Sequence, residues 1–495
     1  MAVFQNNLLA GAGAQSSGDA VHKINQSIRF NYSDGPYLSR AVGSGGNTKT
    51  WTFSCWFKLG LLGSQRSVSP FLWSCHQSDG NRLQLSFDSG SLGVAGDFLS
   101  IYDGASASVI FRTNRVFRDP SAWYNLVLVA DTSNTVSSER FRVYVNGQRE
   151  TSFSTFNAPS LNADLGWNQN GSTYYLGDYF ASHGTYGFDG YIAEMVHIDG
   201  TALDPSSFAE TNDSGIWIPK DVSGLTFGTK GFYIDGRDSA DLGDDESGNG
   251  NDFTSYGLAA HDQVSDSPTN NFCTINSVYA DNAPAGNGGT LSNGNLQYAG
   301  PGNTFSVKGF TFDLPKSGKW YFEYMIGGIN DGFGFIKQGE QGSISAGNGP
   351  GNVSVAQGGG IQYSGWRNGG NFTTNFADTN TGNPFTAGFI HQVAIDVDNG
   401  KFFYGVKNTY YAADAGSDGN PSAGTNELST FAFSTTDVVL ISGNYSGTEY
   451  WNFGQDGTFS GQQTAQGNAD ANGVGNFYYA PPTGYLALCT KNLGS

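Results

Sequence analysis

The residues best suited to chemistry in this sequence form an acidic run near the middle of the chain. The glycines of the following segment, SGNGN at 247–251, allow backbone carbonyls to turn inward. Clustered oxygen donors on a tight loop are what Ca²⁺ binds, although the spacing and terminal Glu of an EF-hand loop are missing. A solvated acidic turn is the alternative. The predicted ligands are Asp235, Asp238, Asp241, Asp244 and Asp245.

A second candidate is a set of aromatic residues in two loop-rich stretches. Flat rings beside Asn and Asp are suited to stacking on sugars, and Trp and Tyr also serve as core and interface residues. The predicted ligand-binding residues are Trp167, Tyr174, Tyr179 and Tyr186 in the first stretch and Tyr363 and Trp366 in the second.

No arrangement of residues indicates catalysis. The nearest pair of carboxylates for glycoside hydrolysis is Glu194 and Asp199, and an offset of five places them on opposite faces of a regular strand. The six His are isolated, and no GxSxG elbow is present. The glycine-rich start GAGAQSSG lacks the Lys-Ser/Thr ending of a phosphate loop. We therefore predict a protein that is not an enzyme and has no catalytic residues.

Composition and charge narrow the class of protein. The chain has 71 Gly, 14% aromatic residues and only 14% charged residues, which is typical of short strands joined by tight turns. The net charge is −19, and no basic stripe for nucleic acid is present. No stretch of about 18 apolar residues predicts a membrane span. The four Cys are scattered, so free buried thiols are favoured over a Cys55–Cys75 disulfide.

The elements that must position these groups are β-strands. Leu126, Leu128 and Ala130 alternate with polar or opposite-facing neighbours, and residues 141–146 alternate in the same way. Asn146-Gly147 is a dipeptide that suits a two-residue hairpin turn. A similar pattern over residues 393–408 predicts a turn at Asn399-Gly400.

The predicted architecture is all-β, with two antiparallel β-sandwich or jelly-roll domains joined by an irregular connector. Turn signals every 8–12 residues support this prediction. The predicted boundaries are an N-terminal arm at 1–20, a first β-domain at 21–200, a connector with the acidic loop at 201–300, and a second β-sandwich at 301–495.

The first domain resembles a laminin G-like domain, which is a concanavalin A-type jelly roll. The resemblance rests on the ordered series WTFSCWFK, DPSAWYNLVLVAD, VYVNG, YYLGD and FDGYIAEM, which covers most of residues 25–200. It implies two packed antiparallel sheets with sugar or protein ligands on the concave face or rim loops, often with a Ca²⁺. Glucanases of this fold carry an E-x-D-x-x-E type of motif, which is absent here.

The last part of the chain resembles a SPRY-type β-sandwich, whose loops recognise partners and which has no chemistry of its own. The series GKWYFE, VAIDVDNGKFFY, WNFGQ and PPTGYLALCTKNL carries this resemblance over about 175 residues. A laminin G-like module, the segment DSPTNNFCTINS and then a SPRY-like module is an order that resembles virion proteins of tailed bacteriophages.

This resemblance implies a non-enzymatic surface protein of a phage particle, made in the host cytoplasm and displayed on the virion. The leading prediction is a tail-fibre-like adhesin that binds host glycan or protein. The alternative is a capsid-decorating or cement protein anchored by its N-terminal arm, and a polysaccharide depolymerase is disfavoured. The expected partners are other virion proteins and a further copy of the chain in a homo-oligomer. Ca²⁺ is the one cofactor predicted, and neither nucleic acid nor membrane insertion is expected.

Overall fold

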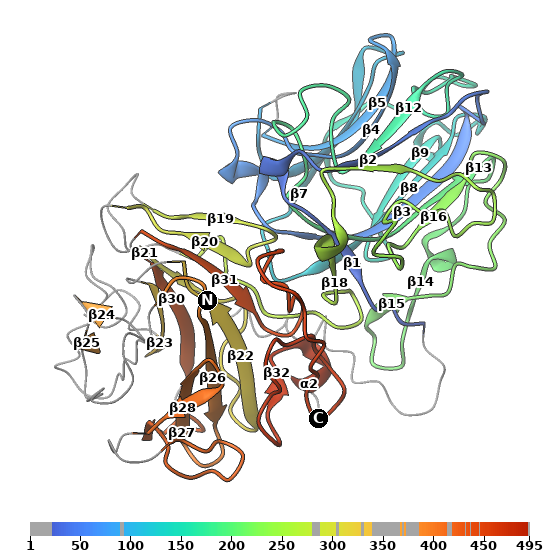
Figure 1. Ribbon diagram of the computed structural model, residues 1–495. Coiled ribbons are helices and arrows are strands. Elements are labelled where there is room, and N and C mark those ends of the chain that lie inside the picture. The colour runs from blue at the N-terminus through green and yellow to red at the C-terminus, as the bar shows by residue number, and fades with distance from the viewer. Residues whose placement is uncertain are drawn as a thin grey trace. The chain divides into compact units, whose positions relative to one another are not determined.

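The computed structural model describes residues 22–89, 94–279, 288–302, 306–327, 331–338, 367–368, 371–372, 386–412, 418–430, 432–435, 437–444 and 446–493. The chain divides into two compact units, residues 1–271 and 272–495, which we describe separately (Figure 1). The predicted all-β class is confirmed. In the described parts, helix is limited to α2 (Thr490–Leu493) and to short 3₁₀ turns at Tyr32–Asp34, Gly63–Gln65, Ser137–Glu139, Pro205–Ser207 and Ala260–Asp262.

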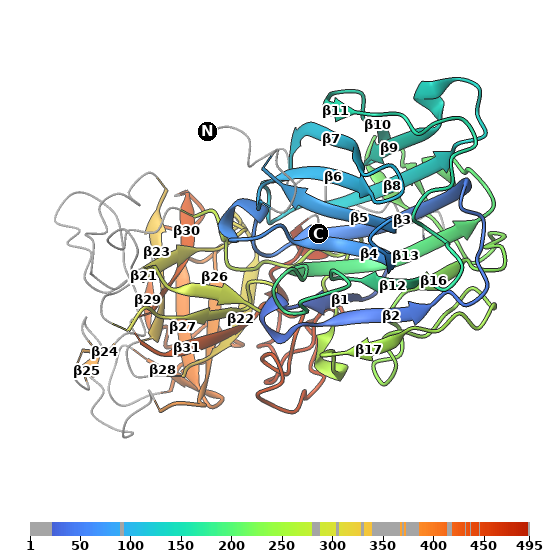
Figure 2. The ribbon, with the colours of Figure 1, turned by 90° about the horizontal axis from the view of Figure 1, so that it is seen from above.

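The first unit contains two eight-stranded antiparallel sheets, whose strands can be followed in Figure 2. Sheet A has the order β10 (Gln148–Arg149), β9 (Phe141–Val145), β8 (Trp123–Asp131), β3 (Thr50–Leu59), β13 (Gly190–Asp199), β1 (Ser27–Phe30) and β18 (Gln263–Val264), and β16 (Phe232–Ile234) also pairs with β13. Sheet B has the order β11 (Phe153–Phe156), β7 (Ser108–Val116), β6 (Phe98–Asp103), β5 (Asn81–Asp88), β4 (Phe71–Ser78), β12 (Thr173–Leu176), β2 (Tyr37–Ala41) and β17 (Thr254–Tyr256).

The core of the first unit lies between these sheets. The predicted inward residues Leu126, Leu128 and Ala130 are fully buried in it, against aromatic residues of β3 and β4 such as Trp51 and Trp73. Period-two alternation therefore identified the core face of β8 correctly. The apolar side chains on this face of β8 therefore belong to one core shared by the two sheets.

The opposite face of sheet A is buried as well, which the prediction of half-buried strands missed. Val127 and Val129 on β8 pack against Phe208, Val222 and Phe227. These partners come from the predicted connector, in which β14 (Ala209–Thr211) pairs with β15 (Trp217–Pro219). The segment after β13 therefore covers sheet A with a second apolar cluster.

The predicted connector at 201–300 is not one element. Residues up to 271 belong to the first unit, because β16, β17 and β18 add strands to its sheets. Residues from 272 belong to the second unit, to which β19 (Thr290–Ser292) and β20 (Gln297–Ala299) contribute. The turn-rich composition had hidden these short strands. The predicted arm at 1–20 lies outside the described residues.

The two hairpins differ. Asn146 and Gly147 have φ values of 48° and 73°, so they form the predicted two-residue turn between β9 and β10. The second hairpin joins β26 (Ile390–Asp396) to β27 (Lys401–Val406) through four residues, and Asp396 accepts the Asn399 N–H at 3.0 Å. The predicted turn at Asn399-Gly400 is therefore confirmed, although the loop has four residues and the Asp396 side chain closes it.

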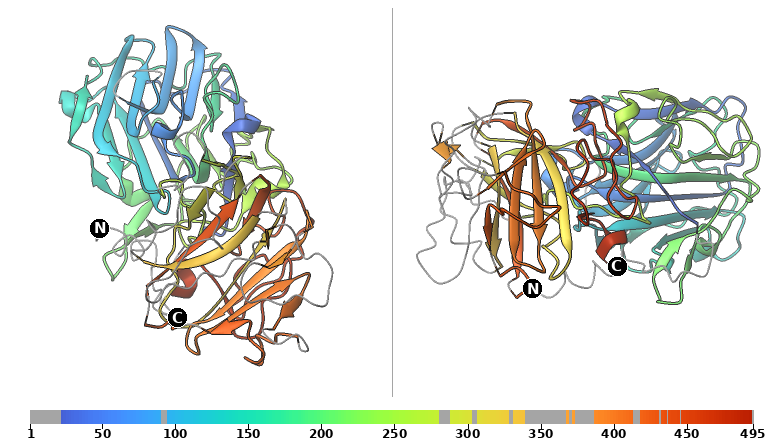
Figure 3. Two further views of the ribbon diagram at one scale, coloured as in Figure 1. Left: turned by 90° about the vertical axis from the view of Figure 1, so that its left-hand side faces the viewer. Right: turned by 60° about the horizontal axis from the view of Figure 1, so that its bottom comes forward.

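The second unit is also built from sheets, which Figure 3 shows in yellow to red. Its nine-stranded sheet has the order β19, β20, β31 (Thr448–Asn452), β22 (Lys319–Met325), β26, β27 and β28 (Thr409–Tyr411), with β29 (Ser429–Thr430) beside β27 and β32 (Leu486–Ala487) beside β22. A three-stranded sheet has the order β21 (Ser306–Gly309), β30 (Val438–Asn444) and β23 (Asp331–Lys337). The remaining described pair is β24 (Arg367–Asn368) with β25 (Asn371–Phe372).

Strand β22 is buried on both faces. Phe322 contacts Phe333 and Phe453 on one side, and Tyr321 packs against Phe477 on the other. Aromatic side chains occur at both even and odd positions of β22, so both faces of the strand carry them. Such a strand can lie between two apolar layers. The second unit thus has apolar clusters on both sides of its central strand.

All four cysteines are free and buried, as predicted. Burial raises the pKa of the Cys75 thiol to about 12, and burial also raises the pKa of Cys55. Neither thiol is therefore activated as a nucleophile. Within the described parts of the chain, no helix is long and apolar enough to cross a membrane.

Candidate functional site

Stacked aromatic rings gather on the face of sheet B that points away from the core. We call Tyr37, Tyr175, His183 and Tyr256 the aromatic surface. Because Leu38 and Leu176 point into the core, their neighbours Tyr37 and Tyr175 must point outward. Three adjacent strands, β12, β2 and β17, therefore carry its tyrosines.

The central ring of the aromatic surface is Tyr37. Its ring centroid lies 4.7 Å from that of Tyr256, with the planes 11° apart, and 4.1 Å from that of His183. Tyr256 is directly opposite Tyr37 in the strand register and is 46% exposed. Since one face of the Tyr256 ring rests on Tyr37, the other face is the one open to a ligand. Such a face can pack against the apolar C–H side of a sugar ring.

A buried carboxylate orients the His183 ring. Asp178 Oδ2 lies 2.8 Å from His183 Nδ1, and the same side chain accepts the Tyr179 N–H at 2.7 Å. Burial raises the pKa of Asp178, while the histidine and the Tyr179 N–H lower it. The loop that follows β12 is thereby held against sheet B, with His183 beside Tyr37.

Two of the predicted ligand-binding residues lie in this loop. Tyr179 and Tyr186 are both half-buried, their centroids are 5.4 Å apart, and each contacts Phe71. Next to them, Phe180 stacks on His76 at 3.6 Å. The prediction that Tyr179 and Tyr186 contact a ligand is not tested by these contacts. They do place both rings on the same loop as His183.

The predicted exposure of Trp167 and Tyr174 is wrong, because both side chains are fully buried in the core. The Trp167 ring packs 4.5 Å from Trp73 and 4.6 Å from Tyr174. The polar ends of these two side chains find partners inside: Trp167 Nε1 lies 3.3 Å from His197 Nε2, and the Tyr174 hydroxyl donates to Asn168. Buried Trp and Tyr need such partners, so these residues have a structural role.

Residues Tyr363 and Trp366 lie outside the described residues, so their assignment stays a prediction. The tyrosines missed by the sequence reasoning are Tyr37, Tyr175 and Tyr256. Each sits on a short strand far from the others in the sequence. The signal that could have found them is the alternation in Tyr37-Leu38 and Tyr175-Leu176, which marks both tyrosines as outward.

The acidic loop closes on itself through hydrogen bonds. Asp238 and Asp241 accept the N–H groups of Ala240 and Gly243, two residues further on. Asp245 accepts the Tyr233 N–H at 2.8 Å. Asp244 is exposed. In the part of the chain that the structure describes, no three carboxylate, His or Cys groups converge as a metal site would require. The donors as placed do not form a calcium cage, and calcium binding stays a prediction.

The two carboxylates considered for glycoside hydrolysis have separate partners. Glu194 lies 2.5 Å from His22, whereas Asp199 accepts the N–H groups of Asn47 at 2.7 Å and Lys230 at 3.1 Å. Among the residues that the structure describes, Glu194 and Asp199 share no partner that would make them an acid and nucleophile pair. The absence of enzymatic activity stays a prediction.

The second unit keeps its central ionisable groups inside. Glu323 is fully buried and accepts the N–H groups of Tyr478 and Tyr479 at 2.9 and 2.8 Å. Burial raises the pKa of Glu323 to about 7 and lowers the pKa of the buried His391 to about 3. Neither group can reach a ligand in solution, so both serve the packing of the sheet.

Residues 33–207 match a family model described as the concanavalin A-like lectin/glucanases superfamily. The match covers less than half of the chain and lies within the first unit. It agrees with the two packed antiparallel sheets, so the first unit has a concanavalin A-like jelly-roll fold, as the resemblance implied. No curated protein matches the chain.

Solved structures similar to the chain include lectin-like and SPRY domains. A putative carbohydrate binding protein from Bacteroides ovatus is 15% identical, with 48% of this chain and 60% of that chain covered and a TM-score of 0.30. The Ruminococcus gnavus sialidase module CBM40 bound to sialyllactose is 16% identical, with 34% and 89% covered and a TM-score of 0.21. The SPRY domain of human HERC1 is 12% identical, with 33% and 91% covered and a TM-score of 0.23. Similarity at this level assigns no ligand.

Proposed function

We propose that the protein is a non-enzymatic adhesin of a phage particle that binds host glycan through the aromatic surface of its first unit. The observation that carries the glycan part is the outward stack of Tyr37, His183 and Tyr256 on a sheet of a lectin-like jelly roll. The placement on a virion surface rests on the order of modules in the sequence.

The aromatic surface suits a sugar better than a large protein partner for two reasons. Its rings are held by one another and by Asp178, so binding costs little side-chain entropy. Serine and threonine side chains stand beside the rings on the same face, because Ser39 and Thr254 pair across β2 and β17. Apolar faces flanked by hydroxyl groups match the mixed apolar and polar surface of a pyranose.

Glycan binding is tested by comparing Tyr256→Ala with Phe156→Ala. Phe156 is an aromatic of comparable exposure, 36%, on β11 at the other edge of sheet B. We expect Tyr256→Ala to weaken binding to oligosaccharides from the host surface at least about tenfold, as loss of a central aromatic contact does. Phe156→Ala should bind like the wild type. Equal binding by the two variants would exclude the aromatic surface as the site.

Location on the particle is tested by an averaged image of the assembled virion. Density for this chain at the tail supports the adhesin, whereas density on the shell would replace it with the capsid-decorating alternative. Release of reducing ends from a host polysaccharide would contradict the assignment as a non-enzyme.

A further inference from the structure

A cavity of about 260 Å³ lies on the side of sheet A away from the core. Its walls come from β13, from the end of β16 and from the segment that precedes β1. The neighbouring Val196 and Ala193 pack in apolar clusters separate from the sandwich core. The residues that matter for its chemistry are Glu194, Tyr233, Asp235, Arg237, Asn25 and Gln26.

One of the buried side chains that line this cavity is Glu194, which is only 4% exposed. Its Oε1 atom makes hydrogen bonds with two neighbouring groups, His22 Nε2 at 2.5 Å and the Tyr233 hydroxyl at 2.9 Å. Among the described residues, no group donates to Oε2. Because both of these bonds go to Oε1, Oε2 is the carboxylate oxygen left to accept a hydrogen bond from a molecule that enters the cavity.

The backbone at Glu194 is unusual for a strand. Its φ is +46°, in the left-handed region, and the register of β13 against β3 shifts between Ala193 and Val196. This β-bulge turns the side chain to a place that a regular strand would not give it. A non-glycine residue in this conformation costs free energy, which the bonds from His22 and Tyr233 offset. Such local strain is common where a side chain is positioned for a ligand.

Most of the charges around the cavity are compensated within the protein, whereas Lys23, which also lines the cavity, is exposed to solvent. His22 faces Glu194, and that hydrogen bond raises the pKa of His22. Asp235 accepts from Arg237 Nε at 2.7 Å, and Arg237 also pairs with Glu246 at 3.1 Å. A cationic ligand would be repelled by His22 and Arg237, and an anionic ligand would be repelled by Glu194. The ligand that fits best is therefore a neutral molecule that donates hydrogen bonds.

We infer that this cavity is a binding site for one neutral, hydroxyl-rich ring such as a single pyranose, with a ring hydroxyl donating to Glu194 Oε2. The volume lies just below the range of small-molecule pockets, so it admits one ring rather than a chain. The exposed Asn25 and the half-buried Gln26 supply amides at the mouth. This site lies on sheet A, and the inference does not depend on the aromatic surface of sheet B.

The probes are methyl glucopyranoside, methyl mannopyranoside and methyl galactopyranoside, each added to the full chain and followed by saturation-transfer NMR. For a ligand of this size we expect a dissociation constant on the order of 1 mM for at least one of them. Asn25→Trp should fill the mouth of the cavity without touching the core. This variant should raise the dissociation constant at least about tenfold, because the Trp side chain would exclude the sugar from the cavity.

The matched control is Asn170→Trp, since Asn170 is an exposed loop residue outside the cavity. It should bind as the wild type does. Glu194→Gln keeps the side-chain shape and removes the carboxylate, so it should also bind at least about tenfold more weakly.

Absence of signal with all three sugars on the wild-type chain would overturn this inference, and so would binding that survives Asn25→Trp. Binding that is lost in Tyr256→Ala but kept in Asn25→Trp would support the aromatic surface and refute the cavity. Binding of glucosamine without binding of the neutral sugars would refute the assignment of a neutral ligand.

Discussion

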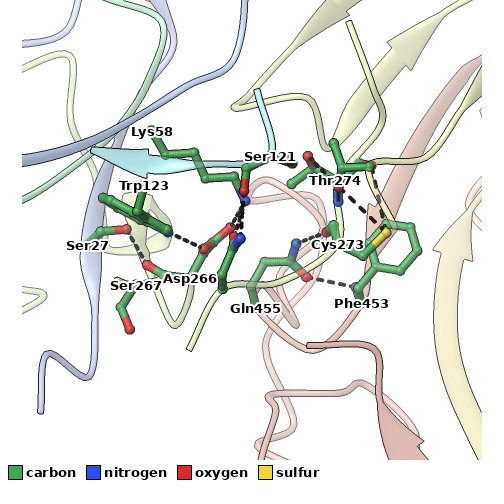
Figure 4. A network of polar contacts seen from close by, with 12 residues as sticks. Ser27, Lys58, Ser121, Trp123, Asp266, Ser267, Cys273, Thr274, Phe453 and Gln455 are labelled. Atoms are coloured by element: carbon green, nitrogen blue, oxygen red, sulfur yellow. Dashed lines mark hydrogen bonds and ion pairs between the residues drawn. The ribbon is translucent and has the colours of Figure 1, made fainter. Parts of the chain in front are cut away.

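Residues 263–271, at the end of the first unit, are attached to the rest of that unit by a buried ion pair. Removing this ion pair tests the fold quantitatively. Lys58 Nζ lies 2.8 Å from Asp266 Oδ2 and also donates to Asn271 at 2.7 Å (Figure 4). Both charged side chains are fully buried. The indole N–H of Trp123 donates to the other oxygen of Asp266 at 3.0 Å.

We predict that Asp266→Ala lowers the free energy of unfolding of the first unit by about 3–5 kcal/mol, because it leaves the Lys58 ammonium buried without its counter-ion. Trp123 loses its acceptor in the same change, but this loss overlaps with the first and does not add in full. A decrease of this size is a large fraction of the roughly 5–15 kcal/mol that stabilises a typical domain.

The assay is urea unfolding of the full chain combined with hydrogen exchange of peptides from β3 and β8. Because a chain of two units need not unfold in one step, the exchange data assign the loss to the first unit. The control is Asp79→Ala, which removes an ion pair with Arg82 in which Asp79 is 87% exposed. An exposed pair contributes at most about 1 kcal/mol, so this variant should unfold close to the wild type.

The double variant Lys58→Met with Asp266→Leu separates the two parts of the argument. Replacing the whole pair by apolar side chains removes the charge penalty, so this variant should be more stable than Asp266→Ala. If Asp266→Ala unfolded within about 1 kcal/mol of the wild type, the proposed attachment of residues 263–271 to the first unit would be refuted.

Four further predictions follow from particular contacts. Trp167→Ala should destabilise the first unit by about 3–5 kcal/mol, as loss of a core Trp does, and a melt unchanged from the wild type would contradict its burial. Glu323 has a pKa of about 7 against an ordinary 4.5, so between these two pH values the folded chain keeps a proton that the unfolded chain has lost. The free energy of unfolding of the second unit should therefore fall by up to about 3 kcal/mol as the pH rises from 4.5 to about 7. Glu323→Gln should make this free energy, measured by urea titration, less dependent on pH. Gly147→Ala should cost about 1 kcal/mol or more, because φ is +73° and the added Cβ would lie 2.8 Å from the Trp217 ring, whereas Gly80→Ala enters open space and should melt within about 0.5 kcal/mol of the wild type. If the acidic loop binds Ca²⁺, chelation should lower the melting temperature of the first unit, and an unchanged melt would remove the loop as a structural calcium site.

The candidate sites were only partly predictable. Tyr179 and Tyr186 were predicted as exposed loop aromatics, and they are half-buried on the same loop as His183, whereas Trp167 and Tyr174 from the same stretch are fully buried. Loop composition alone could not tell buried from exposed aromatic residues in this stretch, because the segment GWNQNG around Trp167 is compatible with a ring that points inward or outward. What decided the matter was the pairing of Trp167 with Trp73 and His197, which come from distant strands.

Glu194 makes the same point for the cavity. Its neighbours on β13 suggested a regular strand, in which Glu194 and Asp199 face opposite ways. The β-bulge instead brings Glu194 to His22 and Tyr233, which are 172 and 39 residues away in the sequence. No local pattern signals a contact over such separations.

The amino-acid sequence by itself determined the class of fold, the core faces of the long strands and the hairpin at Asn146-Gly147, because period-two alternation and turn chemistry act between near neighbours. Only the tertiary structure decided which tyrosines form a common surface, that the predicted connector is divided between two units, and that Glu194 lines a cavity. Those outcomes depend on strand order and register, which are set by packing across the whole sheet rather than by any one segment.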